Sequence, residues 1–314
     1  MTHRLNAVLF TLITLIAVPF YWLLLQNPSR DVAPHPVSIA QLRVLADSMP
    51  GPRPAKVEMT VIGGRLVSGN VYAAGAGVKR KLLAVTSFRL PVPGGKPVVI
   101  DTGTTLALSR SLAFDAYLPN RQRFVDSNMR EAGVIVATSG SAERLGGLAA
   151  YASRPDGADT LARAKLNAGQ VPSPANRALP WPAGLALRPA VGLRPTAVAP
   201  GIVAIPAPGA SPGAQMIYAR LRDGREYLFA GDVAPLAQNF QEMRVRSRYS
   251  DAGHPADRAA TMRWLVTIAA LGQQSPGLIV VPGNGSGWIL DPRNRTGIVI
   301  AHGQPAPANP AGSR

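Results

Sequence analysis

Residues 134–148 read VIVATSGSAERLGGL, and this stretch decides how the rest of the chain is interpreted. It begins with an uninterrupted apolar run, 134–137, of the kind that forms a buried strand. The run ends at Thr138 in a short loop that contains two serines, and the double glycine Gly146-Gly147 opens a helix. Strand, polar loop and helix in this order predict a layered α/β fold with a site at the end of the strand.

Other predicted strands end in similar loops. The strand at 97–100 runs into Asp101, the strand at 226–229 precedes Asp232, and the strand at 278–281 precedes Asn284. The proline-rich residues 170–200 are expected to be irregular. The remaining apolar patterns predict strands at 57–62, 66–72, 82–90, 202–206 and 216–221, and helices at 39–49, 104–117, 121–132 and 255–271.

Several short segments, in the right order, resemble motifs of the metallo-β-lactamase fold hydrolases. TSGSAERLGG at 138–147 is similar to the family's T-H-x-H-x-D-H-x-G-G, and YLFAGD at 227–232 to its L-F-x-G-D strand. PAPGASPGA at 206–214 resembles the G-H-T-P-G-H loop, VPGNG at 281–285 the final V-P-G-H-D, and DTG at 101–103 the early D-x-G turn. The resemblance covers residues 57–288 and implies an αββα sandwich.

The resemblance also implies that the metal ligands are replaced. Ser139 and Ser141 stand where the family has its first two histidines, Glu143 where it has an aspartate, and Arg144 where it has the last histidine of the motif. Serine hydroxyls are poor zinc ligands, and arginine is a fixed cation.

The other motifs follow the same pattern. Ala210 lies in the loop whose histidines are lost, and Asn284 stands for the last histidine ligand. Asp232, which corresponds to the aspartate that bridges two metals, is retained, and Asp101 matches an outer-shell position. The former active-site pocket is therefore predicted to contain Asp101, Ser139, Ser141, Glu143, Arg144, Ala210, Asp232 and Asn284.

These replacements favour a protein without a metal cofactor. Zinc at a catalytic site needs at least three protein ligands, the chain has no cysteine, and none of His3, His35, His254 and His302 lies in a motif. We expect a non-catalytic binding or scaffolding domain for an unknown ligand or protein partner. The alternative is an active hydrolase of esters, lactones or phosphodiesters that holds zinc at a non-standard site. Metal-free catalysis through the two serines lacks a nearby histidine or lysine base.

The replacement of a histidine by Arg144 makes a specific structural prediction. A carboxylate left in a partly buried cleft needs a positive partner, so the guanidinium is expected to pair with Asp232, with Glu143 as a further partner. Simpler alternatives are that Arg144 turns outward to solvent, that Asp232 caps a helix, and that Asp101 caps the helix at 104–117.

The N-terminus predicts a membrane anchor. Residues 7–25 form a stretch of 19 residues without a charge, enough to cross a hydrocarbon core of about 30 Å. A cleaved signal peptide is the competing interpretation. His3, Arg4 and the terminal amine precede the stretch, which favours a cytoplasmic N-terminus and a periplasmic body on the inner membrane. The expected organisation is an anchor at 1–27, a linker and short helix at 28–55, the sandwich at 56–302 and a disordered tail at 303–314.

The positive net charge favours an anionic partner. Lysine and arginine number 33 against 17 acidic residues, giving +16. The densest cluster, Arg244, Arg246 and Arg248, alternates as on an exposed strand but has no interleaved aromatic residues. Nucleic acid is therefore an unlikely partner, and lipid headgroups beside the anchor account for the charge more simply.

Overall fold

The computed structural model describes residues 2–173, 178–251 and 256–301. The predicted disordered tail at 303–314, His254 and His302 lie outside the described residues. The helices are α1 (Thr2–Phe20), α2 (Ile39–Asp47), α3 (Gly69–Tyr72), α4 (Leu106–Ser111), α5 (Pro119–Glu131), α6 (Ala142–Tyr151), α7 (Gly157–Ala162), α8 (Ala237–Gln241), α9 (Arg258–Gln274) and α10 (Ser286–Ile289), with single turns η1 (Tyr21–Leu25), η3 (Arg248–Asp251) and η4 (Pro292–Asn294). The strands are β1 (Glu58–Ser68), β2 (Arg80–Leu90), β3 (Val98–Ile100), β4 (Ala116–Tyr117), β5 (Val134–Val136), β6 (Thr196–Ala199), β7 (Ile202–Pro206), β8 (Gln215–Arg220), β9 (Glu226–Gly231), β10 (Ile279–Pro282) and β11 (Val299–Ile300).

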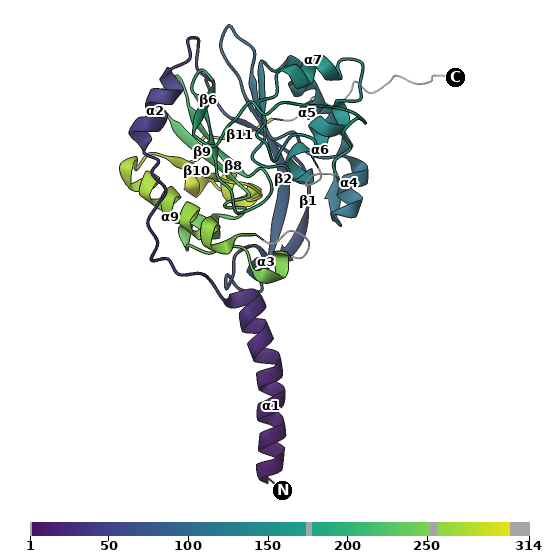
Figure 1. The fold of residues 1–314 in the computed structure, drawn as a ribbon, viewed down its shortest axis with the longest axis vertical. Helices are drawn as coiled ribbons and strands as arrows, with labels where there is room; N and C mark the ends of the chain where they lie inside the picture. Colours follow the sequence, from purple (N-terminus) through teal and green to yellow (C-terminus); the bar gives the residue numbers. More distant parts are fainter. Residues whose placement is uncertain (1, 174–177, 252–255, 302–314) are drawn as a thin grey trace, which may run out of the picture.

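The strands form two sheets that face each other (Figure 1). Within the described part of the chain, the first sheet has the order β11-β1-β2-β3-β5 with β4 paired to β1, and the second has the order β10-β9-β8-β7-β6. An apolar cluster between the sheets joins Phe88 and Ile100 of the first to Ile217 and Phe229 of the second. The predicted two-sheet core is therefore present.

Helices cover the outer face of each sheet and complete the αββα sandwich. On the first sheet, Val99 and Ile135 pack against Met129 of α5 and Leu148 of α6. On the second, residues of α2 and α9 share a cluster with strands β7, β8 and β9. The strand patterns predicted a layered α/β fold, because buried strands carry apolar side chains on both faces, and the family resemblance implied this arrangement of layers.

One strand prediction was wrong at its boundaries. The segments 57–62 and 66–72 were expected to be separate strands divided by a turn at Gly63-Gly64, but β1 runs through both glycines with a bulge between Val61 and Gly63. A Cβ on Gly63 would lie 2.5 Å from the Ala116 carbonyl, and one on Gly64 would lie 2.3 Å from that of Leu83. These glycines therefore allow close strand packing and do not make a turn.

The helix predicted at 104–117 is also shorter than expected. Thr105 caps α4 by accepting a hydrogen bond from the Leu108 amide, and the helix ends at Ser111. The chain then turns back, and Ala116–Tyr117 pairs with β1. Pairing at the bulge of β1 overrides the helical pattern of this segment.

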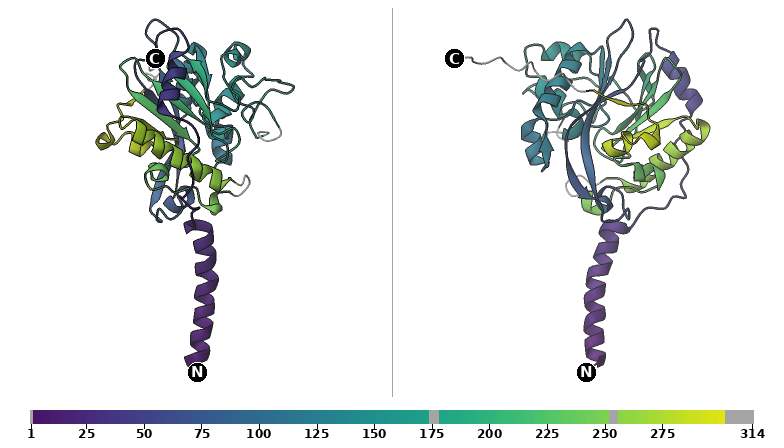
Figure 2. Two further views of the ribbon diagram at one scale, coloured as in Figure 1. Left: turned by 60° about the vertical axis from the view of Figure 1, so that its left-hand side comes forward. Right: turned by 180° about the vertical axis from the view of Figure 1, so that it is seen from behind.

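The N-terminal helix projects from the body in every view (Figure 2). Within His3–Leu25, an 18-residue window has a mean hydropathy of 2.4, and the segment is apolar and long enough to cross a bilayer, as a signal sequence would also be. The residues after it, predicted as a linker, run along α9, where the His35 ring stacks on Trp264 at 3.8 Å.

A buried carboxylate attaches α2 to the second sheet. Glu226 accepts bonds from Arg43 at 2.6 and 2.9 Å, from the Tyr218 hydroxyl at 2.5 Å and from the Ser275 hydroxyl at 2.8 Å. Burial would raise the pKa of Glu226, but these hydrogen bonds lower it to about 2. Glu226 therefore stabilises the fold above its unfolded pKa of about 4.3, and this contribution is lost as the pH falls toward 2.

We expect Glu226→Gln to lower the free energy of unfolding at pH 7 by about 2 kcal/mol, because a charge-assisted hydrogen-bond cluster is lost. The variant should also lose less stability than the wild type between pH 5 and pH 3. Urea unfolding at several pH values measures both effects. Equal acid sensitivity of the two proteins would contradict the assignment.

Candidate functional site

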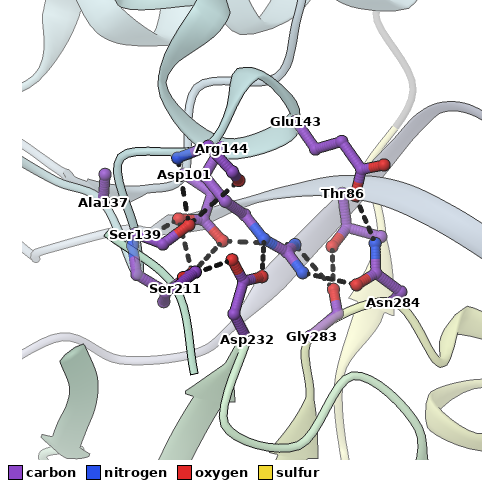
Figure 3. A network of polar contacts seen from close by, with 12 residues as sticks. Thr86, Asp101, Ala137, Ser139, Glu143, Arg144, Ser211, Asp232, Gly283 and Asn284 are labelled. Atoms are coloured by element: carbon purple, nitrogen blue, oxygen red, sulfur yellow. Dashed lines mark hydrogen bonds and ion pairs between the residues drawn. The ribbon is translucent and has the colours of Figure 1, made fainter. Parts of the chain in front are cut away.

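Four strand ends meet at one edge of the sandwich. The parallel strands β3 and β5 of the first sheet lead to Asp101 and Ser139, and the parallel strands β9 and β10 of the second lead to Asp232 and Asn284. Helix α6 starts beside them and carries Arg144. The fold thus brings the predicted strand-end residues together, as Figure 3 shows.

The Arg144 guanidinium occupies the centre of this cluster. Its Nε lies 3.4 Å from Asp232 Oδ1, and its Nη1 lies 3.5 Å from Asp101 Oδ2. Nη1 also donates to the Gly283 carbonyl at 2.7 Å, and Nη2 donates to Asn284 Oδ1 at 2.7 Å. The Arg144 side chain is 0% exposed. The predicted pair with Asp232 is present, and the outward-facing alternative is wrong.

The two carboxylates beside Arg144 have different environments. Burial raises the pKa of Asp101 to about 6, although Arg144 and Thr138 oppose the shift. Burial also acts on Asp232, but the charges of Arg144 and Arg246 and the Ser139 and Ser211 hydroxyls hold its pKa below the usual value. One guanidinium faces two carboxylates, and Asp232, whose pKa is lowered while that of Asp101 is raised, is its anionic partner.

Neither aspartate is a helix cap. Asp101 has a φ of 59°, and its carboxylate accepts the Thr138 amide at 2.6 Å and the Thr138 hydroxyl at 2.9 Å. Asp232 Oδ2 accepts the Ser211 hydroxyl at 2.8 Å, while Leu236 is the N-cap of α8. Both aspartates therefore belong to the polar network, and the cap alternatives do not hold.

Glu143 joins the network through Asn284 rather than through Arg144. Asn284 Nδ2 donates to Glu143 Oε2 at 3.1 Å and to the Ala84 carbonyl at 3.0 Å. Glu143 Oε1 lies 3.4 Å from Nη2 of Arg65. Asn284 thus accepts a hydrogen bond from Arg144 and donates one to Glu143, and so links the two side chains.

The two predicted serines, Ser139 and Ser141, belong to the polar network, but the predicted alanine, Ala210, does not. Ser139 donates to Ser141 at 2.9 Å, and Ser141 is the N-cap of α6. Ala210 packs in the apolar cluster beneath α9, away from the network. Its neighbour Ser211 makes the contact to Asp232. The resemblance therefore indicated the right loop, but the residue that it predicted, Ala210, precedes the contacting residue by one position.

A cavity of about 300 Å³ opens beside the network. Ser141, Ser211 and Asp232 form its polar part, and Leu112, Leu179 and Tyr72 contribute apolar surface. The Arg246 guanidinium lies over the Tyr72 ring at 4.7 Å from its centroid and also lines the cavity. The cavity is polar on the side of the network and apolar on its walls.

Sequence reasoning missed Ser211, Tyr72 and the role of Arg246. The arginine cluster was noted, but its alternation was taken for an exposed strand. The segment is irregular: Arg244 donates to the Ala74 carbonyl at 2.7 Å, and Arg248 lies over the Trp22 ring. The available signal was the cluster itself, because three closely spaced arginines beside the single carboxylate of Glu242 need further acceptors elsewhere.

The residues of this site do not fit a zinc ion. Among the residues that the structure describes, no group of three or more histidine, cysteine, aspartate or glutamate side chains is placed to hold a metal. The Arg144 guanidinium fills the space between Asp232 and Asn284 and repels a cation. Hydroxyl and amide oxygens are weak zinc ligands, and the Asp101 and Asp232 carboxylates are paired with Arg144.

Solved structures with similar folds support the fold described above. No protein-family model and no curated protein matches the chain. A variant of the AiiA protein of B. thuringiensis, with N-decanoyl-L-homoserine bound at its active site, has 14% identity and a TM-score of 0.57, over 74% of this chain and 94% of that one. A probable metal-dependent hydrolase from Staphylococcus aureus has 13% identity and a TM-score of 0.54, over 75% of this chain and 91% of that one. The chain therefore has the metallo-β-lactamase fold of these hydrolases, as its motifs predicted.

The contact between Arg144 and Asp232 can be tested by a double-mutant cycle. We expect Arg144→Ala to destabilise the domain by about 3 kcal/mol, because it leaves buried carboxylates without their cation. Asp232→Ala in the same chain should recover part of the loss. The control is Arg293→Ala, which breaks the exposed pair with Asp291 and should cost less than about 1 kcal/mol. Additive effects of the Arg144 and Asp232 changes would show that the two do not interact.

Proposed function

We propose that this protein is a non-catalytic member of the metallo-β-lactamase fold that binds a ligand or a protein partner through the cavity beside Arg144. The observation that carries the proposal is the fully buried guanidinium bonded to Asp232, the Gly283 carbonyl and Asn284. In this interpretation, a permanent organic cation replaces the metal and holds the strand ends together.

The chemistry of the remaining groups supports binding rather than hydrolysis. Arg144 and Ser211 keep Asp232 anionic and hydrogen-bonded, so it is a weak base. The Ser139 hydroxyl donates to the Ser141 hydroxyl, and the neighbouring Asp232 carboxylate has a lowered pKa, which makes it a poor proton acceptor. A nucleophilic serine needs an adjacent group that removes its proton.

The cavity suits a ligand with both polar and apolar parts. Hydroxyl groups and Asp232 offer hydrogen bonds at one side, while Tyr72, Leu112 and Leu179 offer apolar contact. A cavity of about 300 Å³ is at the small end of the range for small-molecule sites. The cavity is thus a binding site that remains when the metal chemistry is gone.

Metal content and hydrolysis test this proposal directly. The full chain, purified in detergent and dialysed, should contain far less than one equivalent of zinc, iron or manganese. It should not hydrolyse an N-acyl homoserine lactone, a nitrophenyl ester or a bis-nitrophenyl phosphodiester above background. Elemental analysis and absorbance assays measure both quantities.

The competing function is an active hydrolase with a non-standard site. It would be established by about one equivalent of tightly bound metal together with turnover that Asp232→Asn abolishes. Asn keeps the shape and one acceptor oxygen of Asp232, so this variant separates loss of charge from loss of packing. That result would overturn the non-catalytic proposal.

We also propose that α1 anchors the protein in the inner membrane with the body in the periplasm. The apolar segment His3–Leu25 and the positive charges at its N-terminal side support this orientation. A reporter that is active only in the periplasm, fused after Arg314, should therefore be active. A well-expressed but silent fusion, with activity of a cytoplasmic reporter at the same position, would reverse the orientation.

A further inference from the structure

The end of the N-terminal helix is held by the body rather than tethered loosely to it. The Leu24 carbonyl accepts the Gly75 amide at 3.0 Å. The Asn27 side chain donates to the Met243 carbonyl at 2.7 Å and accepts the Val245 amide at 3.1 Å. These hydrogen bonds connect the end of the N-terminal helix to the body, and we call this contact region the joint.

Arg248 adds a contact two residues earlier along the helix, at Trp22. Its guanidinium lies over the Trp22 ring, 3.7 Å from the centroid, and its Nη1 donates to the Trp22 carbonyl at 3.1 Å. Gly75 has a φ of +75°, and a Cβ at this position would lie 2.5 Å from Nη1 of Arg244. The Arg244 side chain can move, so it is the positive φ that favours glycine where this loop meets the helix end.

The length of the helix determines where this joint lies relative to the lipid bilayer. The 23 residues of His3–Leu25 span about 35 Å at 1.5 Å per residue, against about 30 Å for the hydrocarbon core. With Arg4 among the headgroups on one side, Leu24 reaches the headgroups on the other. The residues bonded to Leu24 and Trp22 must then lie at headgroup level too.

The surface around this joint is basic and apolar. The loop between β1 and β2, which holds Gly75, continues into Val78, Lys79, Arg80 and Lys81, and Val78 is 71% exposed. Lys79 and Arg80 are exposed as well. On the other side of the joint, Tyr249 is 63% exposed next to Arg248. We name these residues, Val78 to Lys81 with Arg248 and Tyr249, the membrane-facing surface.

We infer that the membrane-facing surface rests on anionic phospholipid headgroups and fixes the orientation of the body on the bilayer. Lysine and arginine attract anionic headgroups, tyrosine favours the interface, and an exposed valine can enter it. The two sides of the joint present these residue types at the level that the helix sets. This inference rests on the proposed membrane insertion of α1.

The absence of cysteine from the chain allows single labels to report depth. The full chain is reconstituted in nanodiscs of phosphatidylcholine with phosphatidylglycerol, and carries a fluorescent label at Val78→Cys, at Val44→Cys or at Ile13→Cys. Val78 and Val44 are both 71% exposed, but Val44 lies on α2, away from α1 (Figure 1). Quenching by brominated lipids measures how close each label lies to the bilayer.

We expect lipid quenching at position 78 and none at position 44, with strong quenching at position 13. Lys79→Gln together with Lys81→Gln should lower the ratio of docked to free orientations about thirtyfold, from the usual attraction per basic residue. Lys96→Gln, on an exposed loop, is the charge control and should change nothing. Nanodiscs of phosphatidylcholine alone should reduce quenching at position 78.

Three results would overturn the inference in distinguishable ways. Quenching at position 13 with none at position 78 would mean that the anchor is inserted but the body does not dock. No quenching at position 13 would mean that the anchor itself is not inserted, and the proposed membrane location would fail with it. Quenching at position 78 that is equal in neutral and anionic nanodiscs would exclude headgroup charge as the cause.

Discussion

A single buried cation determines the arrangement of this site. Arg144 is the central link between strand ends of both sheets: Asp101 comes from the first, and Asp232, Gly283 and Asn284 come from the second. Removing a charge from water is costly, so such a group persists only when its donors are satisfied. Two carboxylates, one carbonyl and one amide oxygen satisfy Arg144, and each of them is positioned by a strand that ends at the same edge.

Much of the architecture could be predicted because its signals are local. Apolar runs such as 134–137 define buried strands, and the polar residues that follow them mark the site edge. The pair between Arg144 and Asp232 was predictable because both positions belong to motifs with a common geometry. An arginine in one motif beside an aspartate in another left few ways to balance the buried charge.

The errors have a common physical origin in contacts between distant segments. Gly63 and Gly64 suggest a turn, but their role is to admit the Ala116 and Leu83 carbonyls, which the local pattern does not show. Ser211 could not be distinguished from Ala210, because a one-residue shift in an irregular loop leaves the pattern unchanged. The alternation of Arg244, Arg246 and Arg248 resembles a strand, yet each guanidinium has a different partner in space.

In the proposed function, a side chain takes the place of a metal, and this changes how the fold is completed. A metal ion is a separate component, and a domain that depends on it is only as stable as the local supply of that ion permits. A guanidinium is part of the chain and stays protonated over the whole physiological range. The edge of this sandwich can therefore assemble as soon as the polypeptide does, and chelators or metal starvation in its compartment would leave the assembled edge untouched.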